Sequence, residues 1–231
     1  MNGKTENNKA GIETILQKRR KRILYLTQTG VLTAIIFIMA FIPAIGYPKI
    51  GIVSLTLMVI PVAVGAILMG PWVGAWLGFS FGVTSLIQCF TGDAFGAFLF
   101  GLNPFMTIVL CIVPRVLIGM VVGFVFKVFD KFILSKNKNR ALSAPFCAVS
   151  SMIGALTNTV LFISFLALLF LPYMSEVEGF VGGAFWSFII GLITFNSLIE
   201  VAVTLLIGGA IAYALREFLN KKVLHERVAK N

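Results

Sequence analysis

Polar side chains stand inside stretches of this sequence that are otherwise apolar. They are the charged residues Arg115 and Glu200 and the amides Asn158 and Asn196. Because an ionisable group is unfavourable in the interior of a membrane, it is expected to face a partner or a water-filled cavity. An arginine there is suited to binding an anionic group, and a nearby glutamate is suited to orienting that arginine. Asn196 and Glu200 are four residues apart, so a helix presents both on one face.

Two simpler interpretations of these residues remain open. Arg115 and Glu200 lie within about one helical turn of each other in depth, counted from the outer ends of their segments. They therefore also suit a structural ion pair. The two amides are able to bond neighbouring helices instead of a ligand. A cluster of polar groups at one level favours a cavity over several separate contacts.

A catalytic serine is not predicted. Residues 78–82 match the string G-x-S-x-G, but a nucleophilic serine of that kind needs a histidine base. The single histidine is His225, close to the C-terminal end. The glycines Gly74, Gly78 and Gly82 instead recur every four residues, which predicts a smooth helix face for a closely packed neighbour. We therefore expect a protein that is not an enzyme.

Metal and cofactor binding are not predicted either. The three cysteines are Cys89, Cys111 and Cys147, and their spacing is not that of a metal site or a disulfide framework. Each lies in or beside an apolar stretch, as is typical of a cysteine that serves as a small buried hydrophobe. We expect no cofactor and no metal.

Long apolar segments must position the polar residues. Of the 231 residues, 58% are hydrophobic and 12% are charged, and the mean hydropathy is +0.98, values outside the range of most soluble domains. The six segments cover residues 23–42, 51–69, 71–90, 104–129, 144–171 and 184–215. Only helices or closed barrels satisfy backbone groups in lipid, and the alternating pattern of barrel strands is absent. The sequence predicts an all-α integral membrane protein, a bundle of six transmembrane helices.

The distribution of charge indicates the topology. There are 19 Lys and Arg against 9 Asp and Glu, for a net charge of +10. Six spans put both termini on one side, and cytoplasmic termini then place almost every basic residue in the cytoplasm, as the positive-inside rule requires. We expect a basic cytoplasmic N-terminal segment at 1–22, a membrane domain at 23–215 and a basic cytoplasmic tail at 216–231. The positive charge then reflects topology, and nucleic acid is not an expected partner.

Several strings of the sequence are similar to one known family. They are Thr29–Ala34, Ile52–Val62, Gly65–Pro71, Gly78–Ser85, Ile112–Arg115 and Gly154–Thr159. In order and spacing they resemble the substrate-binding S components of energy-coupling factor (ECF) transporters, the bacterial vitamin importers. The resemblance implies a small six-helix protein of the bacterial cell membrane that captures a vitamin or related micronutrient from outside. It also implies docking on a transmembrane coupling protein that carries two ATPase subunits, with membrane lipid as the surroundings.

The resemblance assigns roles to individual residues. Gly30 and Ala34, two small residues of the first helix, map to the contact with the coupling protein. The loop 43–51, with Tyr47 and Lys49, maps to the gate of the outer site. The residues that map to the substrate site and its rim are Arg115, Asn158, Asn196, Asn103 and Trp186.

The sequence also favours one cargo and leaves one alternative function open. The string before Pro61 resembles the pantothenate branch of the family, and a mid-membrane arginine suits a carboxylate, so pantothenate is the favoured cargo. Folate-like, pyridoxine-like and other micronutrients remain open. The alternative is a stand-alone secondary transporter of a small anionic solute, in which Glu200 carries the coupling proton.

Overall fold

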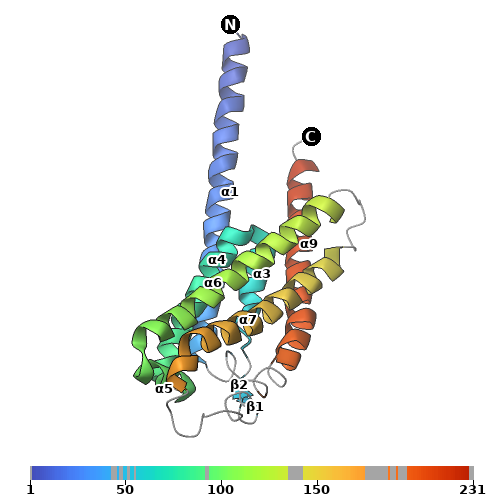
Figure 1. Cartoon of the computed structure of the whole chain (residues 1–231). Coiled ribbons are helices and arrows are strands. Elements are labelled where there is room, and N and C mark those ends of the chain that lie inside the picture. The colour runs from blue at the N-terminus through green and yellow to red at the C-terminus, as the bar shows by residue number, and fades with distance from the viewer. Residues whose placement is uncertain are drawn as a thin grey trace.

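The computed structural model is built almost entirely of helices (Figure 1). It describes residues 2–42, 46, 49–50, 53–54, 56–91, 94–134, 143–174, 187, 191 and 197–228. The α-helices are α1 (Asn2–Phe41), α3 (Val59–Met69), α4 (Pro71–Thr91), α5 (Ala94–Leu102), α6 (Pro104–Phe129), α7 (Ser143–Met174) and α9 (Gly209–Val228). The π-helical turns are η1 (Asp130–Leu134) and η3 (Thr204–Gly208), and a two-stranded sheet joins β1 (Lys49–Ile50) to β2 (Val53–Ser54).

The long helices confirm an all-helical membrane protein. In the described part of the chain, five of them are long and apolar enough to cross a membrane. They are Ile15–Phe41, Pro71–Thr91, Pro104–Phe132, Ser143–Tyr173 and Ser197–Leu219. Helix α3 is as apolar but has only 11 residues, fewer than the roughly 20 that a complete span needs.

The second apolar segment differs from its prediction. A helix over 51–69 was expected, but α3 begins only at Val59, and β1 and β2 pair in antiparallel fashion before it. Pro61 gives one physical reason, because proline has no backbone N–H to donate and is tolerated best in the first turn of a helix. A start at Val59 puts Pro61 in that first turn. The β-branched Ile50 and Val53 favour the strands that precede it.

The connection before α6 is also more ordered than a loop. It contains the short helix α5, whose Leu99 packs in a cluster with Leu110, Leu166 and Phe170 from α6 and α7. Asn103 then caps α6, because its side-chain oxygen accepts a hydrogen bond from the backbone N–H of Met106 at 3.2 Å. This packing holds the end of the bundle that lies opposite the chain termini.

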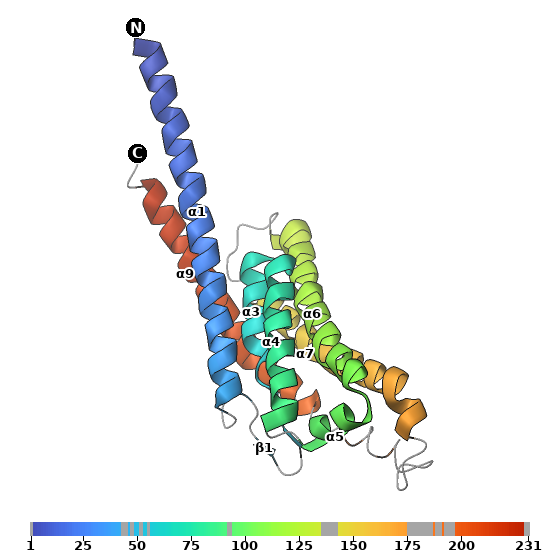
Figure 2. The same cartoon turned by 90° about the vertical axis from the view of Figure 1, so that its left-hand side faces the viewer.

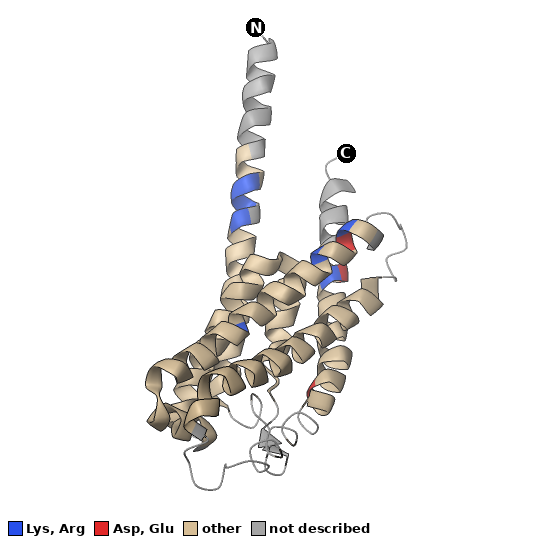
Figure 3. Cartoon of the chain, in the orientation of Figure 1, with Lys and Arg blue, Asp and Glu red and all other residues tan. Residues whose placement is uncertain are grey.

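The described charges gather at one end of the bundle (Figure 3). Helices α1 and α9 both extend beyond the helical body at the same end (Figures 1 and 2), and α5 and the small sheet lie at the other. The elements at that end, α1, the end of α6 with η1, and α9, carry the described charged residues Lys18, Arg19, Arg20, Arg22, Lys127, Asp130, Lys131, Arg216 and Glu217. Within the apolar spans, α6 carries Arg115 and the last span carries Glu200. The membrane domain was expected to begin after residue 22 and to end before residue 216. Helix α1 runs through the first of these boundaries and α9 through the second without a break.

Helices α4 and α6 pack against each other through glycine. A Cβ built at Gly82 would lie 2.8 Å from the backbone oxygen of Cys111, and one built at Gly74 or Gly119 would overlap the backbone of the other helix. Contacts this short leave no room for a side chain. The close neighbour expected for the glycine repeat is therefore confirmed, and it is α6.

Candidate functional site

Arg115 is positioned by its own helix and by two aromatic rings. Its guanidinium carbon lies 4.7 Å from the ring centre of Phe162 on α7 and 5.6 Å from that of Phe81 on α4. Its Nη1 donates a hydrogen bond to the backbone oxygen of Leu110 at 2.7 Å. Its Nε is buried and has no hydrogen-bond partner. The guanidinium is thus fixed in place and retains an unused donor.

The preceding residue, Pro114, explains the bond to Leu110. In an α-helix the carbonyl of Leu110 accepts from the N–H of the residue four positions later, and here that residue is a proline without an N–H. The freed carbonyl accepts from Arg115 instead. The dipeptide Pro114-Arg115 therefore supplies both the vacancy in the helix and the side chain that fills it.

Asn158 and Glu200 form the second part of the polar site. The side-chain nitrogen of Asn158 donates to a carboxylate oxygen of Glu200 at 2.9 Å. Glu200 is only 1% exposed, and the side-chain oxygen of Asn158 is buried without a hydrogen-bond partner. Asn158 and Phe162 are four residues apart on α7, so they share one face of that helix. Because Phe162 contacts Arg115, this face also brings the Asn158–Glu200 pair toward the arginine.

Arg115 and Glu200 make separate contacts. Among the residues that the structure describes, these two side chains form no ion pair within 4.0 Å. The ion pair between Arg216 and Asp130 involves neither of them and lies at the terminal end. Glu200 bonds Asn158 and Arg115 bonds a backbone oxygen. The geometry therefore favours a positively charged arginine that is open to an anionic partner over the structural pair considered from sequence.

Buried hydroxyls extend this polar face along α7. Ser150 and Ser151 are fully buried, and their hydroxyl oxygens have no hydrogen-bond partner. The virtual Cβ of Gly208, in the π-helical turn η3, lies 3.4 Å from the side chain of Ser151. Thr204 of the same turn donates to the backbone oxygen of Glu200 at 2.7 Å. Buried polar atoms without protein partners are sites for ordered water or for the polar groups of a ligand, and π-helical turns are frequent at functional sites.

The other sequence-predicted residues lie apart from this cluster or outside the described residues. Asn103 lies at the N-terminal end of α6, where its side-chain nitrogen is 3.4 Å from the Tyr173 hydroxyl. Gly30 and Ala34 are exposed on α1, and a Cβ built at Gly30 meets nothing within 4 Å. The backbone of Lys49 lies in β1, but its side chain is outside the described part of the chain. The residues that lie wholly outside it are Tyr47, Trp186 and Asn196.

Sequence reasoning missed four residues of the site. They are Phe81, Phe162, Ser150 and Ser151. The paired serines are visible as a polar step in the fifth apolar segment and were a usable signal. The phenylalanines had none, because the sequence contains 22 of them.

The thiols and acids offer no metal centre in the described part of the chain. No group of three or more His, Cys, Asp or Glu side chains there is arranged to hold a metal ion. Cys89 and Cys111 approach to 3.9 Å between sulfurs, and both are buried thiols outside any disulfide, as is Cys147.

Comparisons with known proteins agree with the resemblance seen in the sequence. The family model described as "ECF transporter, substrate-specific component" matches residues 24–212. The pantothenate transporter PanT of Leuconostoc mesenteroides is 30% identical over 197 residues, which cover 83% of this chain and 91% of that protein. The pantothenic acid transporter PanT of Lactococcus lactis is 28% identical over 176 residues, which cover 71% of this chain and 79% of that protein. In structure, the chain is similar to ThiT from Listeria monocytogenes, with a TM-score of 0.56 and 20% identity over 87% of this chain and 97% of the other.

Proposed function

The chain belongs to the substrate-specific components of ECF transporters, and from this premise we propose that its cargo is pantothenate, captured from outside the cell. Such a component is a multi-pass protein of the cell membrane that binds substrate and catalyses no reaction. Two relatives named as pantothenate transporters, at 30% and 28% identity, support this cargo over other micronutrients.

The setting of Arg115 is the main support for pantothenate as the cargo. It is a cation within a membrane span, and no carboxylate pairs with it among the described residues. A charge in that setting needs an anionic partner. Pantothenate supplies a carboxylate, which a guanidinium binds through parallel hydrogen bonds.

The remaining polar groups suit the rest of the molecule. Pantothenate also carries hydroxyl groups and an amide, and the unused oxygen of Asn158 and the carboxylate of Glu200 are acceptors for them. We include Asn196, Asn103 and Trp186 in the proposed site and its rim. Tyr47 and Lys49 belong to the proposed gate.

The topology and the partners form a further part of the proposal. Six spans with both termini in the cytoplasm account for the charge at the end where α1 and α9 extend. Residues 1–22 and 216–231 are then cytoplasmic extensions of the membrane domain 23–215. The partners are a transmembrane coupling protein and its two ATPase subunits.

Binding of pantothenate is the direct test. We expect the purified full-length protein to bind pantothenate and to retain it in native mass spectra, because a buried, fixed cation is complementary to the carboxylate. A thermal shift measured across a panel of vitamins gives the selectivity. Pyridoxine, which has no carboxylate, is the control and should produce no shift. A shift with another vitamin and none with pantothenate contradicts the proposed cargo.

Docking on the coupling protein is tested on α1. Replacing Gly30 and Ala34 with tryptophan should abolish uptake of labelled pantothenate and leave binding unchanged, because both positions are exposed on a face that bulky rings would close. Ile35→Trp is the matched control, since Ile35 is 39% exposed and lies about 100° around the helix from Ala34. Uptake that survives the double replacement rules out this docking face.

Uptake that needs no ATPase and stops with an uncoupler favours the proton-coupled transporter based on Glu200.

A further inference from the structure

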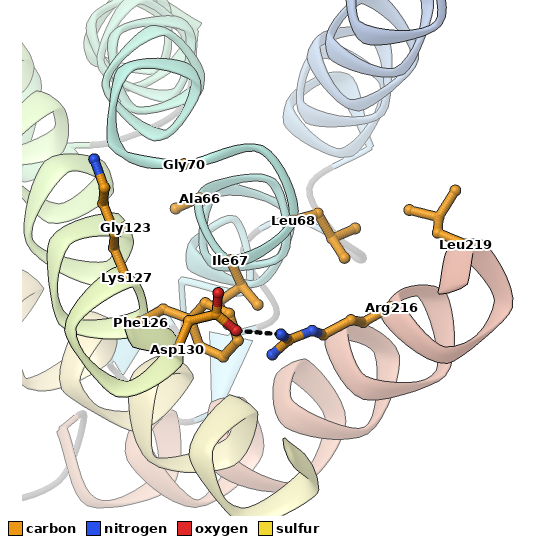
Figure 4. A pocket seen from close by; sticks show the side chains of 10 residues that line it. All are labelled: Ala66, Ile67, Leu68, Gly70, Gly123, Phe126, Lys127, Asp130, Arg216 and Leu219. Atoms are coloured by element: carbon orange, nitrogen blue, oxygen red, sulfur yellow. Dashed lines mark hydrogen bonds and ion pairs between the residues drawn. The ribbon is translucent and has the colours of Figure 1, made fainter. Parts of the chain in front are cut away.

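A cavity of about 300 Å³ lies at the charged end of the bundle (Figure 4). Helix α3, the turn at Gly70, helix α6, the turn η1 and helix α9 contribute to its walls. Lys127 belongs to the wall and follows Arg115 by about 18 Å along α6. The cavity is therefore separate from the proposed substrate site, at the end of the protein that extends toward the termini.

Two of the charged side chains of this cavity, Arg216 and Asp130, are held in a defined arrangement. Arg216 donates from Nη2 to Asp130, and its guanidinium lies 4.8 Å from the ring centre of Phe126. Its Nη1 is buried without a hydrogen-bond partner. Figure 4 shows this pair on one side of the cavity and Lys127 on the α6 wall. Two cations against one carboxylate leave the cavity with a net positive charge.

The walls of the cavity also suit an amphipathic anion. Gly70 lines it between the last turn of α3 and the start of α4 at Pro71, so opposite ends of two helix dipoles meet at its edge and the side chains determine its charge. The aliphatic side chains of Leu68 and Leu219 form an apolar part of the wall. A free anion needs the charges alone, whereas a lipid uses both the charges and the apolar surface.

We propose that this cavity binds the phosphate headgroup of an anionic phospholipid from the cytoplasmic leaflet. Basic pockets between transmembrane helices on the cytoplasmic side bind such headgroups. Arg216 contacts the phosphate, the exposed Lys127 attracts it from the α6 wall, and the acyl chains follow the apolar wall. The inference rests on the cytoplasmic placement of the termini and is independent of the cargo.

Lipid retention by matched variants tests the proposal. The full-length protein is titrated with phosphatidylglycerol in detergent, and bound lipid is counted by native mass spectrometry. Lys127→Gln is expected to lower the apparent lipid affinity about fivefold, the effect of one basic residue near an anionic membrane surface. Lys131→Gln, one turn further along the chain and outside the cavity wall, should leave it nearly unchanged. Arg216→Gln should lower lipid affinity as well.

Three results would overturn the lipid site. Equal losses from Lys127→Gln and Lys131→Gln would indicate diffuse attraction by surface charge. Equal retention of phosphatidylcholine and phosphatidylglycerol by the wild-type protein would exclude recognition of the anionic headgroup. A thermal shift produced by inorganic phosphate alone, of the same size as that with the lipid, would assign the cavity to a soluble anion. Pantothenate binding by Lys127→Gln, measured in parallel, reports on the cargo site and not on this one.

Discussion

Arg115→Met is expected to weaken pantothenate binding about 30-fold or more, because truncating one partner of a buried charge pair costs about 2–5 kcal/mol. Methionine keeps much of the length and the apolar stem of arginine, so the contacts with Phe81 and Phe162 are largely retained. What it removes is the charge and the hydrogen-bond fork. Isothermal titration with the purified variant measures the loss.

The controls separate charge, geometry and folding. Arg115→Lys keeps the charge but loses the planar fork, so it should bind with an affinity between those of the wild type and the methionine variant. Lys131→Met removes a cation from the terminal end and should bind pantothenate as the wild type does. A melting temperature recorded without ligand shows that each variant is folded. Wild-type affinity in a folded Arg115→Met protein would show that the arginine does not bind the cargo. Its role would then be structural, through the hydrogen bond to the Leu110 carbonyl.

The polar part of the candidate site was predictable from sequence because hydropathy makes it conspicuous. Arg115, Asn158 and Glu200 interrupt apolar segments, and the structure brings all of them to neighbouring helices. The sequence left open whether Arg115 pairs with Glu200. That choice depends on Pro114, whose missing N–H frees the Leu110 carbonyl, and on the register between α6 and α7.

The aromatic and hydroxyl contacts were not predictable in the same way. Phe81 and Phe162 are ordinary residues of apolar segments, and only the packing of three helices turns their rings toward the arginine. Ser150 and Ser151 did mark a polar step in the sequence, but serine is short enough to be accommodated on any face of a span, so the step did not indicate burial. Their burial without partners depends on the position of the last span beside α7.

The helices of the fold were likewise predictable from sequence in some segments and not in others. Segments of even hydropathy, such as those that became α4 and α6, were predicted to within a residue of their observed bounds. The segment 51–69 is as apolar, but hydropathy does not register that a helix start close to Pro61 is favoured. A proline favours a nearby helix start, although α6 accommodates Pro114 in its interior. The number of apolar residues indicates only which segment lies in the membrane.

Gly78→Leu is expected to prevent assembly of the bundle, because α4 and α6 pack backbone to backbone at this glycine. A Cβ at Gly78 would lie 2.8 Å from the carbonyl carbon of Arg115 and still closer to its oxygen. Neither helix is able to yield locally, since backbone lies on both sides of the contact. Overpacking a core costs typically about 1–3 kcal/mol and sometimes more, and here the whole leucine side chain has to be accommodated. The yield of monodisperse protein on size-exclusion chromatography measures the effect.

Gly101→Leu is the matched control for this replacement. A Cβ at Gly101, in α5, meets nothing within 4 Å, so the same side chain should leave the yield unchanged. A monodisperse Gly78→Leu protein with wild-type melting temperature would contradict the close packing of α4 on α6.

The smaller variant Gly78→Ala connects this packing to the site. The atoms that its methyl group would displace belong to Arg115 itself, so any folded Gly78→Ala protein must hold that residue in a shifted position. We therefore expect its pantothenate affinity to fall even when it is measured well below the melting temperature. Gly82→Ala, one turn along the same face, presses on the backbone of Cys111 and Ile112 and not on Arg115. A loss of affinity in Gly78→Ala that exceeds the loss in Gly82→Ala, at equal stability, would identify the glycine face as the element that sets the position of the arginine.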